Sequence, residues 1–325
     1  MKQAENGVQV QEHFKLLLEN PDEEVTEGTP FAGSLSGIQT RYVNRSLLRL
    51  PIRERPTVFL LDTDGTTMPL TCVDRIFMEM KNEVNDFIQK EYPNNEELCA
   101  IVEKASLGCP ELREALNTPE VDTNRISLIF TKRINEVIIS KDEKPVFYRD
   151  LENLVLSETT INRNVKGHVF RDAALAIQEW GNPNQRCTYV AIYGSRSSAV
   201  VELLFRNSTH GDLTPFITVF FDSKTVGSKL DSGSYNKIRS RLRKIIPETG
   251  RGFNIVYVTD NSNEAVSSGI SEGVNLTLLA IRPLNRPLTL STLYALGVTT
   301  ISSFDQMRGG TVSYASLCAE VNSYR

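Results

Sequence analysis

The stretch VFLLDTDGTT, residues 58–67, decides the fold of this chain. A short apolar run that ends in an Asp-Gly turn is typical of a buried strand leading into a loop. Side chains two positions apart on an extended segment face the same side, so we expect Asp62 and Asp64 to point into one site. One carboxylate of such a pair can attack phosphorus while the other transfers a proton, and a divalent cation can screen both from a phosphorylated substrate.

Two other interpretations of this stretch are weaker. Asp, Gly and Thr are common where a strand ends in an ordinary turn, so the fragment alone does not establish a site. A calcium-binding loop that starts at Asp62 would need glutamate where Val73 stands.

The composition is that of a globular protein with one large domain, or a domain with an insertion. The chain has 325 residues, of which 40% are hydrophobic and 23% charged, and a formal net charge of −4. This charge argues against nucleic acid as the main partner, and we expect the basic run at 239–244 to be the solvated face of a helix.

No apolar run approaches the roughly 20 residues that span a bilayer, and residues 1–6 lack the apolar stretch of a signal peptide. Five scattered cysteines and three dispersed histidines lack metal-ligand spacing, which indicates a cytoplasmic protein with reduced thiols.

The chain is expected to have four parts. Residues 1–55 are rich in Glu, Asn, Gly and Thr, which indicates a flexible N-terminal extension. Residues 56–80 and 165–307 are expected to form the core, and residues 308–325 a C-terminal tail. Residues 81–164 are expected to form a helical cap inserted after the first strand, and insertions at this place often form lids over the site.

Helices and strands alternate in the second half of the chain. Strands are predicted at 188–193, 217–221, 254–258 and 276–281, and helices at 73–90, 96–104, 111–117, 124–140, 172–180, 198–205, 234–245 and 264–269. This rhythm predicts an α/β fold with a doubly wound parallel sheet and right-handed crossovers. In such a sheet the site lies beyond the carboxyl ends of the strands.

Three further strand ends carry polar groups. Residues 194–198, Gly-Ser-Arg-Ser-Ser, follow the second strand at a helix N-terminus, where hydroxyl and N–H groups either bind a phosphate or simply cap the helix. Lys229 follows the third strand, and by itself it would more often be a surface lysine on a loop than a phosphate ligand. Asp260 follows the next strand and would complete an oxygen-ligand site for Mg²⁺.

This order of features resembles the haloacid-dehalogenase-like phosphatases. A closer resemblance is carried by the following segments: Phe59-Leu60-Leu61-Asp62, Gly65-Thr66-Thr67-Met68-Pro69, Lys166-Gly167-His168-Val169-Phe170, Glu202-Leu203-Leu204-Phe205, Ser208-Thr209-His210-Gly211-Asp212, Phe221-Asp222, Gly227-Ser228-Lys229, Ser234-Tyr235, Thr259-Asp260, Glu264-Ala265 and Arg282-Pro283. With these segments, residues 57 to about 300 resemble one family of that superfamily, the enolase-phosphatases or acireductone synthases. The resemblance implies a Rossmann-like sheet with a helical cap after the first strand.

The resemblance also implies a reaction. Enolase-phosphatases use Mg²⁺ to enolise a 2,3-diketo-5-methylthiopentyl phosphate of methionine salvage and then remove its phosphate. Carried over, Asp62 is the nucleophile and Asp64 the general acid and base. Asp62, Asp64 and Asp260 hold Mg²⁺, while Gly194, Ser195 and Lys229 bind the phosphate. We therefore expect a monomeric enzyme whose partner is a small phosphorylated metabolite, with no nucleic acid and no membrane involved.

The chain departs from the family pattern around one pocket. Asp64 stands where the family has glutamate, Gly194 stands where it has serine, and Arg196 stands where it has glycine. The lid lacks a Trp and a Gly-Tyr, in whose place stand Leu156, Thr159 and Thr160, and one extra residue separates Asp222 from Lys229. Two alternatives therefore stay open: a diverged homologue that binds or regulates with little or no catalysis, and a phosphatase for another small metabolite.

Overall fold

The computed structural model describes residues 55–118, 122–139, 145–157, 165–184, 187–246, 252–283, 285 and 298–308. The chain divides into two compact units, residues 1–41 and 42–325, and all described residues belong to the second. The expected N-terminal extension and C-terminal tail, apart from residues 55 and 308, lie outside the described residues, as do Thr159 and Thr160.

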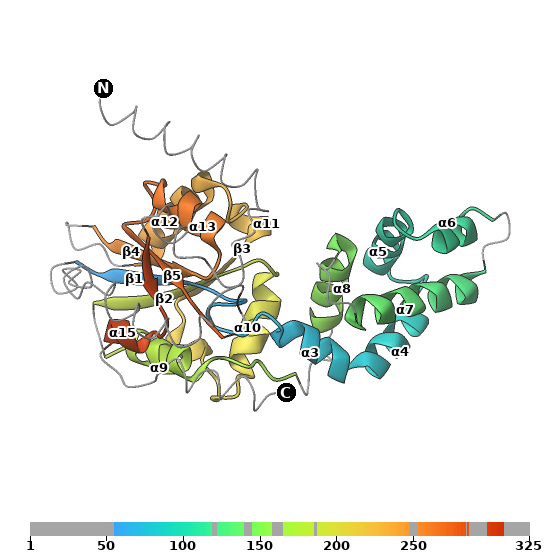
Figure 1. Cartoon of the computed structure of the whole chain (residues 1–325), viewed down its shortest axis with the longest axis horizontal. Coiled ribbons are helices and arrows are strands. Elements are labelled where there is room, and N and C mark those ends of the chain that lie inside the picture. Colours follow the sequence, from blue (N-terminus) through green and yellow to red (C-terminus); the bar gives the residue numbers. More distant parts are fainter. Residues whose placement is uncertain are drawn as a thin grey trace, which may run out of the picture. The chain divides into compact units, whose positions relative to one another are not determined.

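The core is a parallel sheet, so the predicted doubly wound fold is confirmed (Figure 1). Its six strands run in the order β3-β2-β1-β4-β5-β6. Their bounds are β1 Thr57–Asp62, β2 Thr188–Gly194, β3 Val219–Asp222, β4 Asn254–Thr259, β5 Leu276–Ala280 and β6 Thr299–Ile301. The chain winds outward from β1 through β2 and β3, then starts again from β4 on the other side of β1. The crevice at this reversal is where ligands bind in sheets of this kind.

Strand β1 is buried along its whole length because it lies at the centre of the sheet. Phe59 and Leu61 pack in one apolar cluster, and Val58 and Leu60 pack in another, as expected for side chains that alternate between two faces. On the first side the ring of Trp180 stacks on Phe59 at 3.8 Å between centroids. A strand covered on both faces has a continuous apolar run, which is the pattern of residues 58–61.

Helices connect the strands of the core and cover the sheet. They are α9 Arg171–Trp180, α10 Ser198–Arg206, η3 Thr214–Phe216 (a 3₁₀ turn), α11 Ser223–Val226, α12 Ser232–Ile245, α13 Ser262–Gly269 and α15 Asp305–Arg308. A bidentate ion pair joins the start of α9 to the segment after β5: Arg282 donates to both carboxylate oxygens of Asp172 at 2.7 Å. Both side chains are almost fully buried, and the guanidinium lies 4.2 Å from the ring centroid of Phe170. Burial alone would raise the pKa of Asp172, but Arg282 and the hydrogen bonds outweigh burial and hold that pKa below its usual value.

In the part of the chain that the structure describes, six helices lie between β1 and α9 and form the cap. They are α3 Cys72–Glu79, α4 Lys81–Glu91, α5 Glu96–Ser106, α6 Pro110–Leu116, α7 Thr123–Ile139 and α8 Val146–Ser157. The prediction of one helix over 73–90 is wrong in detail, because the backbone leaves helical geometry at Met80 (φ −97°, ψ 21°) and two helices result. In α7 the buried residues Ile126, Phe130 and Ile134 recur at a spacing of four, as an amphipathic helix requires.

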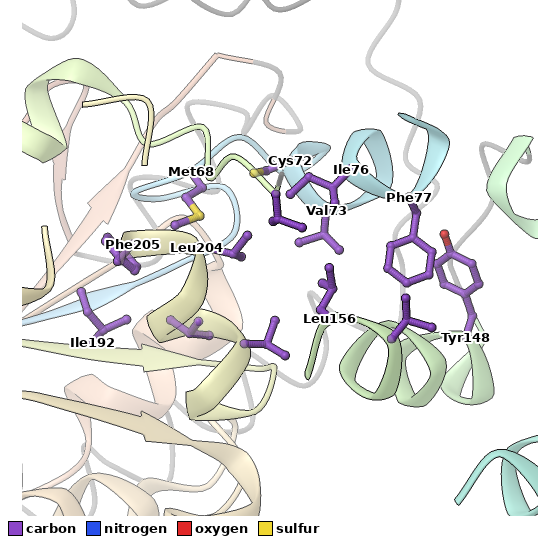
Figure 2. Packing of buried hydrophobic residues seen from close by; sticks show 14 of the residues in the cluster. Met68, Cys72, Val73, Ile76, Phe77, Tyr148, Leu156, Ile192, Leu204 and Phe205 are labelled. Carbon is purple, nitrogen blue, oxygen red and sulfur yellow. The ribbon is translucent and has the colours of Figure 1, made fainter. Parts of the chain in front are cut away.

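The cap and the core share one apolar cluster (Figure 2). Phe77 of α3 and Tyr148 of α8 meet edge to face at 5.6 Å between ring centroids. Leu156 of α8 belongs to the same cluster as Ile192 of β2 and Leu204 of α10. Helices α3 and α8 therefore continue the hydrophobic core into the cap.

Among the described residues, no helix is both long and apolar enough to cross a membrane. Four of the five cysteines lie in this part of the chain, and all four are free thiols, as expected.

Candidate functional site

Asp62 ends β1 with a buried carboxylate in contact with a buried lysine. Its Oδ1 pairs with Nζ of Lys229 and also accepts the backbone N–H of Thr63 at 2.6 Å. Its Oδ2 accepts from the Thr259 hydroxyl at 3.3 Å. Burial raises the pKa of Asp62 well above its ordinary value, and Lys229 acts in the opposite direction. The carboxylate therefore depends on nearby cations to stay ionised and able to act as a nucleophile.

Lys229 lies between two carboxylates, Asp62 and Glu264, the second at 3.7 Å. Burial by itself would lower the pKa of the lysine, but the two acids outweigh it and raise that pKa above its ordinary value. The lysine is thus a fixed positive charge at the end of β1, where a phosphate dianion would need one.

Local structure holds the loop that carries Lys229. Asp222 at the end of β3 forms a capping box with Thr225, which starts α11 directly after the strand. Two tyrosine hydroxyls then fix the loop: Tyr193 donates to the carbonyl of Gly227 at 2.6 Å, and Tyr235 donates to the carbonyl of Lys229 at 2.7 Å. The extra residue between Asp222 and Lys229 therefore does not keep the lysine from reaching Asp62.

Asp260 directly follows β4, the strand that pairs with β1. The hydroxyl of Thr66 accepts the backbone N–H of Asp260 at 2.8 Å and donates to its Oδ1 at 3.3 Å. The side-chain amide of Asn285 donates to Oδ2 at 3.0 Å and to the carbonyl of Gly65 at 2.9 Å. Gly65 has φ +76°, and this residue without a side chain leaves room for the carboxylate of Asp260. Burial, with a contribution from Glu264, raises the pKa of Asp260 to about 7.

Glu264 and Asn285 were not among the predicted site residues. Oε2 of Glu264 accepts from Thr259 at 2.7 Å and from Tyr257 at 2.8 Å, so it is held in place behind Lys229. Glu264 could have been found from its place in the segment after Asp260. No local pattern marks Asn285, because its function depends on reaching Gly65, 220 positions earlier in the chain.

The side chain of Asp64 forms an ion pair with Arg196. Arg196 also reaches Glu152 of α8 at 3.2 Å, and the Glu152 side chain is only 1% exposed. Burial raises the pKa of Glu152 to about 7 against the opposing charge of Arg196. The proton-transfer carboxylate expected from the sequence is therefore tied through one guanidinium to the cap.

The loop after β2 carries the other predicted phosphate ligands. A Cβ at Gly194 would lie 2.7 Å from Cγ2 of Val201, so the position is closely packed. Ser195 is exposed, and the N-terminus of α10 is capped by Ser197, which accepts the N–H of Val200 at 3.4 Å. The capping interpretation thus applies to Ser197, and the hydroxyl of Ser195 is left for a ligand.

The structure brings together Asp62, Lys229 and Asp260 of the predicted site residues, and it directs Asp64 toward Arg196. Within the described ranges, no three His, Cys, Asp or Glu side chains converge as a metal-binding group. The roles predicted for Gly194 and Ser195 in phosphate binding, and for the three aspartates in metal binding, stay predictions.

Comparisons with known proteins identify relatives whose names all include enolase-phosphatase E1. The chain is 30% identical to enolase-phosphatase E1 of Drosophila mojavensis over 237 residues, which is 71% of this chain and 88% of the fly protein. The enzyme of the same name from Drosophila persimilis is 30% identical over 242 residues, or 74% and 91% of the two chains. A probable bifunctional methylthioribulose-1-phosphate dehydratase/enolase-phosphatase E1 of Arabidopsis thaliana is 31% identical over 262 residues, and this match spans 78% of the chain and 49% of the plant protein.

Among solved structures, the UTR4 protein (Unknown transcript 4 protein) of Saccharomyces cerevisiae superposes with a TM-score of 0.51 at 23% identity. The match covers 77% of this chain and 99% of the yeast chain, and it shows a shared fold. No family model matches the sequence.

Proposed function

Because this chain belongs to the enolase-phosphatase family and is a phosphatase, we propose that it is a Mg²⁺-dependent enolase-phosphatase of methionine salvage. Its substrate would be a 2,3-diketo-5-methylthiopentyl phosphate, which it would enolise and dephosphorylate as a monomer. The observation that carries the proposal is the buried carboxylate of Asp62 at the end of the central strand, paired with Lys229.

In the first step of the proposed dephosphorylation, a carboxylate oxygen of Asp62 attacks phosphorus and the P–O bond to the rest of the substrate breaks. Asp64 enters this step as the carboxylic acid, gives its proton to the leaving oxygen and becomes the carboxylate, while an aspartyl phosphate remains on Asp62. In the second step water attacks that phosphorus while Asp64 takes a proton from the water. Inorganic phosphate leaves, and both carboxylates return to their initial state.

Lys229 supports this chemistry because it is fixed beside the nucleophile. It balances the charge of Asp62 before the reaction, and it can pair with phosphate oxygens as negative charge develops on them. Ser195 and the backbone of Gly194 would bind the same oxygens from the loop after β2. Glu264 would keep the lysine cationic and aimed at the strand end.

The donor set fits Mg²⁺, which prefers hard oxygen ligands and few protein carboxylates. Asp62 and Asp260 would supply one carboxylate each, and Asp64 would supply its backbone carbonyl while its side chain pairs with Arg196. The fit is supported by electrostatics, since the charge of Asp260 adds to the rise in the pKa of Asp62 and a bound cation would oppose that rise. When bound, Mg²⁺ supplies Lewis-acid stabilisation of the charge on the phosphate.

The deciding experiment is a steady-state assay of phosphate release. The purified protein is assayed with the diketo phosphate and with p-nitrophenyl phosphate, each with Mg²⁺ and with EDTA, beside an Asp62→Asn variant. We expect the wild-type protein to release phosphate from both substrates with Mg²⁺ and from neither with EDTA, and we expect Asp62→Asn to release none. Turnover of p-nitrophenyl phosphate alone would identify a phosphatase for another metabolite. An inactive wild-type protein that still binds phosphate would favour a binding or regulatory protein. Gly194, which lacks the hydroxyl that the family has at this position, would then be one reason for the loss of activity.

A further inference from the structure

Arg196 occupies a place between two carboxylates that come from different parts of the chain. It lies in the loop after β2, and its side chain is 15% exposed. One Nη pairs with Asp64 of the loop after β1, and the other lies 3.2 Å from Oε2 of Glu152 on α8. One guanidinium thus joins the two loops at the strand ends to the cap.

A second contact joins the same helix to the same loop. Oδ1 of Asn153 accepts the backbone N–H of Ser197 at 3.1 Å. Consecutive residues of α8, Glu152 and Asn153, therefore bind consecutive residues of the loop, Arg196 and Ser197. Two adjacent bonds of this kind fix the direction of the loop as well as its distance from the helix.

The Arg196–Glu152 pair is poorly built for stability alone. Among the described residues, Nε of Arg196 and Oε1 of Glu152 are both buried without a hydrogen-bond partner. Unpaired buried polar atoms are costly, and apolar residues of similar size often replace a buried ion pair without loss of stability. Arg196 also pairs with Asp64, and we therefore look for a role of the Arg196–Glu152 pair other than stability.

We propose that Arg196 is a positioning residue for Asp64, and that Glu152 of the cap holds Arg196 in place. The carboxylate that transfers the proton would then be oriented only when α8 is docked on the loop. The inference rests on the proposed function, in which Asp64 is the general acid and base. The family has glycine where this chain has Arg196, and a glycine there could not pair with Asp64.

Four variants test the proposal by steady-state kinetics with p-nitrophenyl phosphate. For Arg196→Gln we expect kcat to fall about 100-fold with KM changed less than about threefold, since a misplaced catalytic group costs about that much in rate. For Glu152→Gln we expect a fall of about tenfold. The double variant Arg196→Gln/Glu152→Gln should be no slower than Arg196→Gln, because both act through one interaction. Arg196→Lys, which keeps the charge, should recover part of kcat.

A charge swap separates positioning from simple tethering. In Arg196→Glu/Glu152→Arg the loop and α8 can still pair, but a carboxylate now faces Asp64, so kcat should stay at least about 100-fold low. Recovery of wild-type kcat by the swap would overturn the proposal, since it would show that only the tether matters. So would a kcat for Arg196→Gln within about threefold of wild type. Glu202→Gln and Arg206→Gln are matched controls, because these two residues form an exposed ion pair on α10 for which, among the described residues, no hydrogen bond or ion pair with Asp64 or the cap is found.

A readout without turnover keeps the test independent of the proposed reaction. Backbone hydrogen exchange is measured over residues 146–157 in wild type, Arg196→Gln and the Arg206→Gln control. Faster exchange of α8 in Arg196→Gln alone is expected, and unchanged exchange would overturn the coupling even if wild type proved inactive. An inactive wild type with this exchange difference would reject the proposed function while the link between cap and loop stood.

Discussion

Replacement of Gly65 by alanine should lower activity about 100-fold by displacing Asp260. Gly65 has φ +76°, and a Cβ there would lie 2.6 Å from Cγ of Asp260 and 2.8 Å from its Oδ1. Carbon atoms that are not bonded to each other normally lie about 3.5–4.0 Å apart, so the carboxylate must move by about 1 Å. A left-handed conformation at alanine adds a cost of about 1–2 kcal/mol to the folded state. A 1 Å displacement of a catalytic group costs about 10²-fold in rate.

The control for this variant is Gly211→Ala. Gly211 has φ +86°, but a Cβ there would meet no atom within 4 Å, so alanine carries the conformational cost without the clash. Urea denaturation should show that both variants lose stability, by at least about 1–2 kcal/mol. Phosphate release in Mg²⁺ should fall about 100-fold in Gly65→Ala and stay near wild type in Gly211→Ala. Activity of Gly65→Ala within about threefold of wild type would refute the placement of Asp260 in the reaction.

Two further predictions concern buried charges. Arg282→Ala leaves Asp172 buried without its partner and should cost about 3–5 kcal/mol in urea denaturation; a loss below about 1 kcal/mol, as expected of the exposed control Arg206→Ala, would contradict this. Burial raises the pKa of Glu152 to about 7, against 4.5 in the unfolded chain. The protonated form therefore contributes to the stability of the fold below pH 4.5, and this contribution is lost as the pH rises through 7. This pKa difference corresponds to about 3 kcal/mol of unfolding free energy. Between pH 4.5 and 7 the unfolding free energy of Glu152→Gln should therefore fall less than that of wild type. An equal fall in the two proteins, measured by urea denaturation, would contradict the raised pKa.

The sequence was sufficient to predict features that depend on local pattern. The apolar run 58–61 identified the central strand because both of its faces are buried, and parallel strands then brought Asp62, Lys229 and Asp260 to one edge. Helix 146–157 was not predicted as a separate element, since valine, phenylalanine, tyrosine and asparagine have only moderate helix propensity and packing on the core decides the outcome.

The side-chain partners of the site could not be predicted from local pattern. Arg196 meets Asp64 across 132 positions of sequence and Glu152 across 44. These three residues come together only when the cap is folded. The alternation of side chains on a strand predicted that Asp64 lies near Asp62, but it could not predict that Arg196 pairs with Asp64. The two carboxylates of the opening motif therefore have different partners, Asp62 with Lys229 and Asp64 with Arg196.

In the proposed reaction, Asp62 carries the phosphate between the two steps. Wild-type protein is mixed with p-nitrophenyl phosphate and Mg²⁺, quenched during turnover and reduced with borohydride, which converts an aspartyl phosphate to homoserine. Mass spectrometry of the peptide that contains residues 62 and 64 then locates the change. Homoserine at position 62 alone is the predicted result, and homoserine at position 64, or active protein with neither residue converted, would contradict the account.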